Sequence, residues 1–274
     1  MRMNTQYLIN GRHDVALTPL DRGLAYGDGV FRTFPVRLGK VHCWERHYRQ
    51  LSEDCKALGI VCPQASLLQH DVALICGETE LAAVKIIVTR GEGARGYAVP
   101  ALSQPTRIVI KSAMPDYPEP HFTEGVRVHL CQLRLAEQPR LAGIKHLNRL
   151  ENVLARMEWV DPKIADGVLL DAEGRVIECT MSNLFVRHGN TLTTPDLSRC
   201  GVAGVTRQRV LEMAPLLGLD AHVSNFDLDH LLAADEVIAC NSLFGAWQVR
   251  HMGDRTWEVG TLAARLRNLL EQDE

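Results

Sequence analysis

The stretch LAGIKHLNRLE, residues 141–151, decides how this sequence is interpreted. Its lysine, Lys145, lies at the start of a run in which apolar residues recur every three or four positions, namely Ile144, Leu147, Leu150, Leu154 and Met157. This spacing predicts an amphipathic helix over Lys145–Trp159. A lysine beside such an apolar stripe is a candidate nucleophile, because burial lowers its pKa. The alternative is a solvated lysine near a helix start.

A glycine-bearing loop, GVAGVT at 201–206, leads directly into a second predicted helix, 206–217. Glycines let the main chain approach a ligand closely, and the N–H groups at a helix start favour a phosphate. Thr206 adds a hydroxyl. The alternative is a flexible turn in which Thr206 caps the helix. The loop matches neither the Walker nor the Rossmann pattern.

A carboxylate, Glu178, is predicted at the end of a short strand, 175–177, just before the polar turn TMSN. It is either structural or the partner of a protonated ring nitrogen. The sequence contains no G-x-S-x-G elbow, no H-E-x-x-H and no zinc-type cysteine cluster. Hydrolase and metalloenzyme interpretations therefore lack support, and no metal site is expected.

Composition and charge indicate which partners and which compartment to expect. The 274 residues have a net charge of −3, with 46% hydrophobic and 23% charged residues and no long charged block. This argues against nucleic acid or an anionic membrane as the main partner. No apolar run approaches the roughly 20 residues of a membrane span, and the polar start does not resemble a secretion signal. The eight cysteines form no C-x-x-C pair, which predicts reduced thiols in a cytoplasmic protein.

Strands and helices mix in both halves of the chain without a strict βαβ rhythm, so we expect an α+β fold with two domains. Three prolines between Met114 and Pro120 favour an extended connector. The predicted division is an N-terminal α+β domain at 1–114, a proline-rich linker at 115–121 and a larger C-terminal α+β domain at 122–274. Within the first domain the patterns predict a hairpin at 6–15, strands at 31–36, 38–41, 83–89 and 106–112, and helices at 45–58 and 65–76.

In this order, Lys145, Glu178 and the glycine loop resemble the fold-type IV pyridoxal-phosphate enzymes. That family includes branched-chain aminotransferases, D-amino-acid aminotransferases and aminodeoxychorismate lyases. Within it, the lysine segment 141–151 and the segment TRGEGARGY, 89–97, are most similar to those of the lyases. D-amino-acid aminotransferases tend to carry an arginine and a histidine two positions apart where this chain has Arg95 and Tyr97. Aminotransferases often have tyrosine where this chain has Phe31.

The resemblance implies a role for each matching residue. Lys145 would hold pyridoxal 5'-phosphate as a Schiff base, and Glu178 would pair with the protonated pyridine nitrogen. The other cofactor-binding residues would contact the phosphate: Arg49, Val205, Thr206 and Ser242. Arg95 and Tyr97 would meet a substrate carboxylate. The cofactor would lie between the two domains.

The resemblance also implies an activity, the conversion of 4-amino-4-deoxychorismate to 4-aminobenzoate and pyruvate in the synthesis of a folate precursor. A D-amino-acid or branched-chain aminotransferase of the same fold is the nearest alternative. A further alternative is a protein that only stores the cofactor. Storage does not require the cofactor ring to accept electrons, whereas the pairing of Glu178 with the ring nitrogen would support that. Relatives are homodimers that bind a small-molecule substrate, and we expect the same here.

Overall fold

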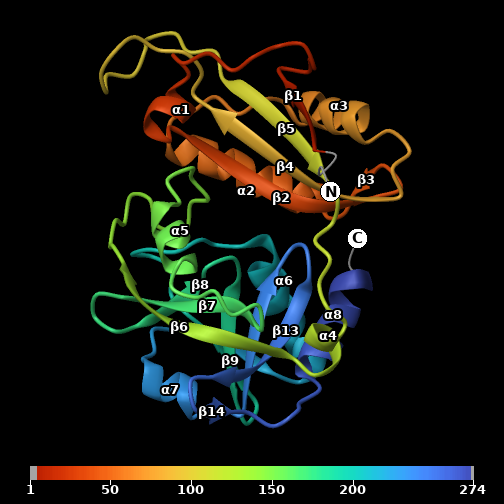
Figure 1. Ribbon diagram of the computed structural model, residues 1–274, viewed down its shortest axis with the longest axis vertical. Coiled ribbons are helices and arrows are strands. Elements are labelled where there is room, and N and C mark those ends of the chain that lie inside the picture. The colour runs from red at the N-terminus through yellow and green to blue at the C-terminus, as the bar shows by residue number, and fades with distance from the viewer. Residues whose placement is uncertain (1–4, 273–274) are drawn as a thin grey trace. The chain divides into compact units, whose positions relative to one another are not determined.

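The structure is a computed structural model that describes residues 5–272. Their internal contacts divide them into two compact units, each of which is seen in Figure 1. The first unit comprises the chain up to Pro115 together with Ile144–Asn148, and the second comprises Asp116–Gly143 and the chain from Arg149 onward. The return of residues 144–148 to the first unit follows from no sequence pattern that we identified.

The first unit is built on a five-stranded antiparallel sheet with the order β1-β5-β4-β2-β3. Its strands are β1 (Gln6–Ile9), β2 (Gly29–Arg37), β3 (Lys40–Val41), β4 (Leu81–Thr89) and β5 (Thr106–Ser112). β4 and β5 are rich in valine, isoleucine and threonine, which suit a pleated, half-buried surface. The strands predicted at 31–36, 83–89 and 106–112 are confirmed.

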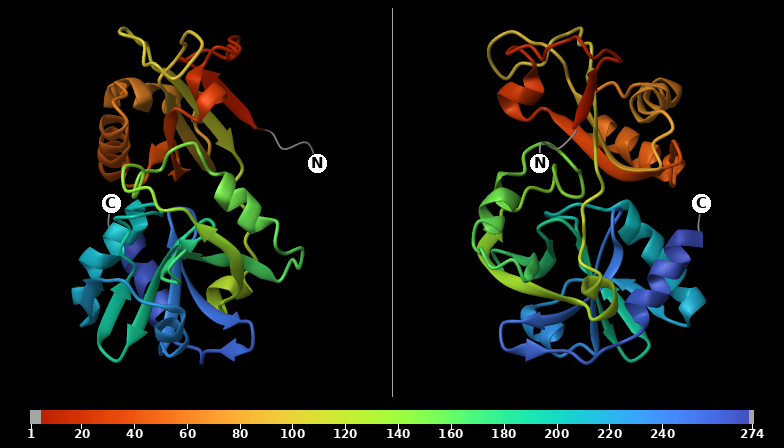
Figure 2. Two further views of the ribbon diagram at one scale, coloured as in Figure 1. Left: turned by 90° about the vertical axis from the view of Figure 1, so that its left-hand side faces the viewer. Right: turned by 45° about the vertical axis from the view of Figure 1, so that its right-hand side comes forward.

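Two helices cover one face of this sheet. They are α2 (Trp44–Ala57) and α3 (Ala65–Cys76), both close to their predicted bounds; a short helix, α1 (Arg22–Tyr26), precedes β2. Figure 2 (left) shows α2 and α3, in orange, along the same side of the strands. Leu51 from α2 and Leu68 from α3 share a buried core with alternate strand residues such as Phe34 and Ile86. The alternation places one side of each strand against the helices.

The predicted N-terminal hairpin is only half correct. Asn10 and Gly11 both have positive φ, 52° and 79°, as the turn requires, and Ile9 exchanges two main-chain hydrogen bonds with Arg12. The return arm forms no strand, however. β1 pairs with β5 instead, from Gln6 opposite Lys111 to Ile9 opposite Ile108. A pairing partner that is about 100 residues away in the sequence leaves no local signal.

The second unit contains a nine-stranded mixed sheet with the order β11-β10-β9-β12-β13-β6-β7-β8, to which β14 adds beside β13. Its parallel pairs are β10 with β11, β13 with β6, and β6 with β7. The strands are β6 (Val126–Leu135), β7 (Ile164–Asp171), β8 (Val176–Cys179), β9 (Asn183–His188), β10 (Thr191–Thr194), β11 (Asp220–Val223), β12 (Glu236–Asn241), β13 (Gly245–Met252) and β14 (Arg255–Thr256).

Helices of the second unit are α4 (Pro120–Thr123), α5 (Leu150–Arg156), α6 (Val205–Met213), the 3-10 helix η1 (Ala214–Leu217), α7 (Leu228–Leu232) and α8 (Leu262–Gln272). α6 and α8 share a buried core with β9 and β12, in which Phe185 and Ile238 meet Val210 and Leu266. The expected α+β class is therefore confirmed. The sequence analysis missed β11, β13 and β14, and the one-turn helices α4 and α7.

Candidate functional site: an extended lysine segment, a buried carboxylate and a helix start

Lys145 lies in an extended segment, so the helix predicted over Lys145–Trp159 is wrong for its first five residues. The N–H of Phe31 donates to the carbonyl of Lys145 (3.0 Å), and the N–H of Leu147 donates to the carbonyl of Gly29 (2.9 Å). Residues 144–148 thus line up against the start of β2, with Val30 opposite His146. α5 begins only at Leu150.

The apolar spacing predicted the wrong helix start because the apolar residues that produce it do not lie in one environment. Ile144 is buried in the core of the first unit, whereas Leu150 is 68% and Met157 is 70% exposed. The apolar stripe of α5 therefore faces no core of its own unit. The same spacing arises here from one buried residue of the extended segment, Ile144, followed by an exposed helix face.

The amine of Lys145 lies above an aromatic ring that it shares with a second lysine. The Lys145 Nζ is 4.8 Å from the centroid of Phe31, and the Lys85 Nζ is 4.3 Å from the same centroid. Lys85 is half-buried on β4, where it pairs with Thr33 of β2, and burial lowers its pKa. The sequence analysis missed Lys85. The available signal was a lone cation within the otherwise uncharged run AVKIIVT.

Glu178 is buried at the end of β8, and its carboxylate is held by the glycine loop. Oε2 accepts the N–H of Val202 (2.9 Å) and lies 3.4 Å from the amide nitrogen of Asn183. Asn183 also donates to the Val202 carbonyl (2.8 Å) and accepts the N–H of Gly204 (3.2 Å). A Cβ at Gly204 would stand 2.3 Å from the Asn183 oxygen, so the loop needs glycine there. Glu178, Asn183 and the loop are thus joined in one hydrogen-bond network.

The start of α6 presents a donor-rich surface beside two hydroxyls. Gly204 precedes the helix and offers no capping side chain, while Val205 and Thr206 form its first turn. The first N–H groups of a helix have no partner within the helix, and the positive end of the helix dipole adds to their attraction for anions. Thr206 Oγ1 lies 3.2 Å from Ser242 Oγ, which follows β12. The structure thus brings Val205, Thr206 and Ser242 together, as a phosphate site requires.

Arg49 lies on the exposed part of α2 in the first unit. The buried positions of that helix are Trp44, His47, Leu51, Asp54 and Cys55. Lys145 belongs to the same unit as Arg49, and Glu178, Thr206 and Ser242 belong to the other. The phosphate role of Arg49 stays a prediction.

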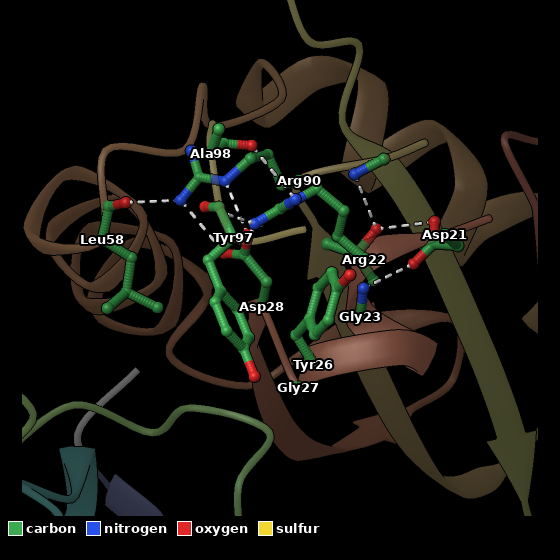
Figure 3. Close-up of polar contacts among 12 residues, drawn as sticks. Asp21, Arg22, Gly23, Tyr26, Gly27, Asp28, Leu58, Arg90, Tyr97 and Ala98 are labelled. Carbon is green, nitrogen blue, oxygen red and sulfur yellow. Dashed lines mark hydrogen bonds and ion pairs between the residues drawn. The ribbon is translucent and has the colours of Figure 1, made fainter. Parts of the chain in front are cut away.

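The loop that carries Arg95 and Tyr97 is fastened by a buried arginine (Figure 3). Both side chains are exposed, Tyr97 by 85%. Arg22 donates to three successive carbonyls of this loop, those of Gly96 (3.0 Å), Tyr97 (3.3 Å) and Ala98 (3.3 Å). The loop is therefore positioned by polar contacts to its main chain. The Tyr97 ring lies against the Tyr26 ring, with 5.4 Å between their centroids.

The charge of Arg22 is balanced by Asp28, which also binds Arg90 (Figure 3). Asp28 Oδ2 accepts from Arg22 Nε (2.9 Å) and Arg90 Nε (2.8 Å), and Oδ1 accepts from Arg90 Nη2 (3.0 Å). Arg90 in turn donates to the carbonyls of Leu58 and Gly59, each at 2.7 Å. Burial alone would raise the pKa of Asp28, but the hydrogen bonds from Arg90 and Arg22 outweigh it and hold that pKa below its usual value.

Comparison with known proteins identifies the family. The sequence pattern of the class IV amino-transferases matches residues 29–252. The chain belongs to this family.

Within residues 5–272, no three His, Cys, Asp or Glu side chains are grouped so that they could hold a metal ion. Over the same range, no helix is long and apolar enough to cross a membrane.

Individual relatives within the class IV family include lyases and aminotransferases. An aminodeoxychorismate lyase from Vibrio harveyi is 36% identical over 96% of this chain and 99% of its own. The crystal structure of 4-amino-4-deoxychorismate lyase from Pseudomonas aeruginosa is 48% identical and superimposes with a TM-score of 0.93, over 97% of this chain and 98% of its own. A D-alanine aminotransferase from Listeria monocytogenes is 26% identical over 88% of this chain and 84% of its own.

Proposed function

We propose that this class IV family member is a pyridoxal-phosphate-dependent lyase that converts 4-amino-4-deoxychorismate to 4-aminobenzoate and pyruvate. The observation that carries the proposal is the 48% identity, over nearly the full length of both chains, to a 4-amino-4-deoxychorismate lyase of known structure. The 36% identity to a second such lyase supports it. Tyr97, in place of the histidine that D-amino-acid aminotransferases tend to carry, favours the same activity.

The donor set of this chain fits the cofactor. The aldehyde needs a primary amine that is partly shielded from water, and Lys145 is half-buried above Phe31. The pyridine nitrogen needs a buried carboxylate, and Glu178 is 4% exposed. The phosphate needs N–H and O–H donors, which the first turn of α6, Thr206 and Ser242 provide. We propose that Arg49 adds a positive charge to this last group.

The cofactor, when bound, spreads the negative charge that develops on the substrate carbon next to the amine. Lys145 would hold the cofactor aldehyde, and its amine, once free, would take the proton from that carbon. Glu178 would keep a proton on the pyridine nitrogen. The electrons of the broken C–H bond form a new double bond in the substrate ring as the ether C–O bond breaks. The enolpyruvyl group leaves, gains a proton and becomes pyruvate, and the ring becomes aromatic.

We propose that cationic groups of the first unit select the substrate. The substrate carries two carboxylates, and Arg95 and Tyr97 are the proposed partners for one of them. Lys85 is a further candidate, because it is half-buried and lies over the same ring as Lys145. A partly desolvated ammonium group attracts a carboxylate more strongly than a solvated one.

The test is to incubate the purified protein and pyridoxal phosphate with 4-amino-4-deoxychorismate and measure 4-aminobenzoate and pyruvate together. We expect equal amounts of both products. Lys145→Ala should abolish turnover and the visible absorbance of the bound cofactor, and borohydride followed by mass mapping should label Lys145. Normal turnover in Lys145→Ala, or a label on another residue, would end the assignment.

An aminotransferase acting on D-amino or branched-chain amino acids is the second candidate, favoured by the similarity to D-alanine aminotransferases. The protein is mixed with D-alanine and 2-oxoglutarate. Pyruvate and glutamate without any lyase turnover would favour this activity. If the cofactor is bound and neither reaction proceeds, the protein stores the cofactor.

We also propose that the protein is a homodimer in the cytoplasm, with a small molecule as its substrate and neither nucleic acid nor membrane as its partner. The resemblance to dimeric relatives supports the first point. All eight cysteines are free thiols, six of them buried, which suits a reducing compartment. Sedimentation analysis at micromolar concentration tests the dimer, and a single monomeric species would contradict it.

A further inference from the structure

Arg32 and Asp54 form a buried ion pair in the first unit, between strand β2 and helix α2. Both side chains are almost fully buried, and Arg32 Nη2 donates to Asp54 Oδ2. Gln50, one turn earlier on α2, lies with its amide nitrogen 3.5 Å from the other Asp54 oxygen. The mechanism derived above does not use this pair.

The pair is not explained by stability alone. Removing two charges from water costs more free energy than their attraction returns in many proteins, and apolar replacements are often neutral or stabilising. Arg32 Nε is also buried and has no hydrogen-bond partner among the described residues, which adds to the cost. A pair retained at such a cost points to a role beyond packing.

Asp54 makes one contact that gives the pair such a role. Its Oδ2 accepts the main-chain N–H of Lys145 at 3.2 Å, across 91 positions of sequence. The carbonyl of the same residue accepts the N–H of Phe31 at 3.0 Å. The main chain of Lys145 is thus held from both sides, by α2 through its N–H and by β2 through its carbonyl.

We propose that the Asp54–Arg32 pair is a positioning device for Lys145, in which Arg32 fixes the Asp54 carboxylate and that carboxylate fixes the lysine main chain. The inference rests on the proposed function only in that Lys145 is the residue that binds the cofactor aldehyde. Neither side chain is a catalytic residue, because each acts through the main chain of Lys145.

The test compares two neutral replacements that differ in one acceptor. Arg32→Met with Asp54→Asn removes both charges and keeps a side-chain oxygen for the Lys145 N–H. Arg32→Met with Asp54→Leu has nearly the same shape and no acceptor. The matched control is Arg107→Met with Asp71→Leu, which removes another ion pair of the first unit. Asp71 is buried and Arg107 half-buried, with 2.5 Å between Arg107 Nε and Asp71 Oδ2, and the pair makes no contact to Lys145.

Each protein is measured for its dissociation constant for pyridoxal phosphate, for the visible absorbance per folded chain, and for thermal unfolding without cofactor. Loss of one hydrogen bond to a charged group predicts a dissociation constant about tenfold higher in the Asp54→Leu pair. We expect the control pair to stay within about twofold of wild type. The Asp54→Asn pair should bind the cofactor more tightly than the Asp54→Leu pair but less tightly than wild type, because it keeps an acceptor that Arg32 no longer fixes. Cofactor binding by the Asp54→Leu pair that equals the control would overturn the inference. A wild-type chain that binds no cofactor would instead defeat the proposed function.

If the Asp54→Leu pair does not fold, amide hydrogen exchange in the wild-type protein decides the point without a substitution. A main-chain N–H that donates to a buried carboxylate exchanges slowly. We expect the Lys145 amide to be protected to the same degree as the amides inside β2. Exchange as fast as in the exposed loop 94–98 would show that Asp54 does not hold the segment.

Discussion

The hydroxyls of Thr206 and Ser242 lie 3.2 Å apart, although 36 residues separate them in the sequence. One comes from the first turn of α6 and the other from the residue that follows β12. Two hydroxyls and a helix start in one place suit the phosphate proposed above better than a planar carboxylate, because a phosphate accepts hydrogen bonds on several sides.

We therefore expect Thr206→Ala and Ser242→Ala each to weaken pyridoxal phosphate binding by about tenfold. The combined variant should lose less than the product of the two effects, because the hydroxyls contact each other. Fluorescence titration of the cofactor measures both. Ser198→Ala is the control, since this exposed hydroxyl contacts only Asp196. Unchanged affinity in both single variants would contradict the phosphate site.

Glu178→Gln keeps the shape of the side chain and an oxygen to accept the Val202 N–H, but it removes the negative charge. The pyridine nitrogen would lose its proton, and proton removal from the substrate should slow by about 10²-fold or more. Single-turnover kinetics of 4-aminobenzoate formation measure the step. Glu158→Gln is a suitable control, because Glu158 also accepts main-chain N–H groups, from Gln132 and Leu133. Equal rates for the two variants would make Glu178 purely structural.

Arg22→Lys should loosen the loop that carries Arg95 and Tyr97. A lysine offers a single amine in place of the planar guanidinium that contacts three carbonyls and Asp28. We expect trypsin to cleave after Arg95 about tenfold faster, and KM to rise more than kcat falls. Arg175→Lys controls for general destabilisation, because Arg175 bonds Asp171, Glu173 and Glu137 in the second unit. Cleavage at the wild-type rate would show that Arg22 does not hold this loop in place.

Asp28 predicts a specific dependence of stability on pH. Its pKa is lower in the folded protein than in the unfolded chain, so its contribution is complete above the unfolded value, about pH 4. That contribution is lost as the pH falls through the lower, folded value. Asp28→Asn should therefore lower the unfolding free energy by about 1–3 kcal/mol at pH 7 and by progressively less below about pH 4.

Urea unfolding of wild type and Asp28→Asn between pH 3 and pH 7 checks this dependence. Asp14→Asn is the control, because Asp14 also has a lowered pKa through Arg12 but both side chains are exposed. We expect no measurable effect from that surface pair. A difference between wild type and Asp28→Asn that stays constant with pH would contradict the charge-based explanation.

Local patterns predicted the elements whose partners lie near in the sequence or whose composition is distinctive. The strand Thr106–Ser112 and the helix Trp44–Ala57 needed only β-branched content or apolar spacing, and the loop before α6 needed only its glycines. The Lys145 segment failed because its partner, β2, is more than 100 residues earlier. Lys85 and Asp54 were missed for the same reason. Their importance lies in the groups that they meet across the fold: Lys85 shares the Phe31 ring with Lys145, and Asp54 accepts the Lys145 N–H. The lone charge of Lys85 within AVKIIVT marks that residue but does not say which group it meets.

The assignment of residues 144–148 to the first unit constrains how the gene could be divided. A two-fragment version cut at Pro115 would leave Lys145 on the C-terminal piece, while strand β2, which pairs with its segment, would lie on the other. Neither fragment alone would hold the amine in its native setting. Appearance of the cofactor's colour on mixing the fragments would therefore report their reassembly.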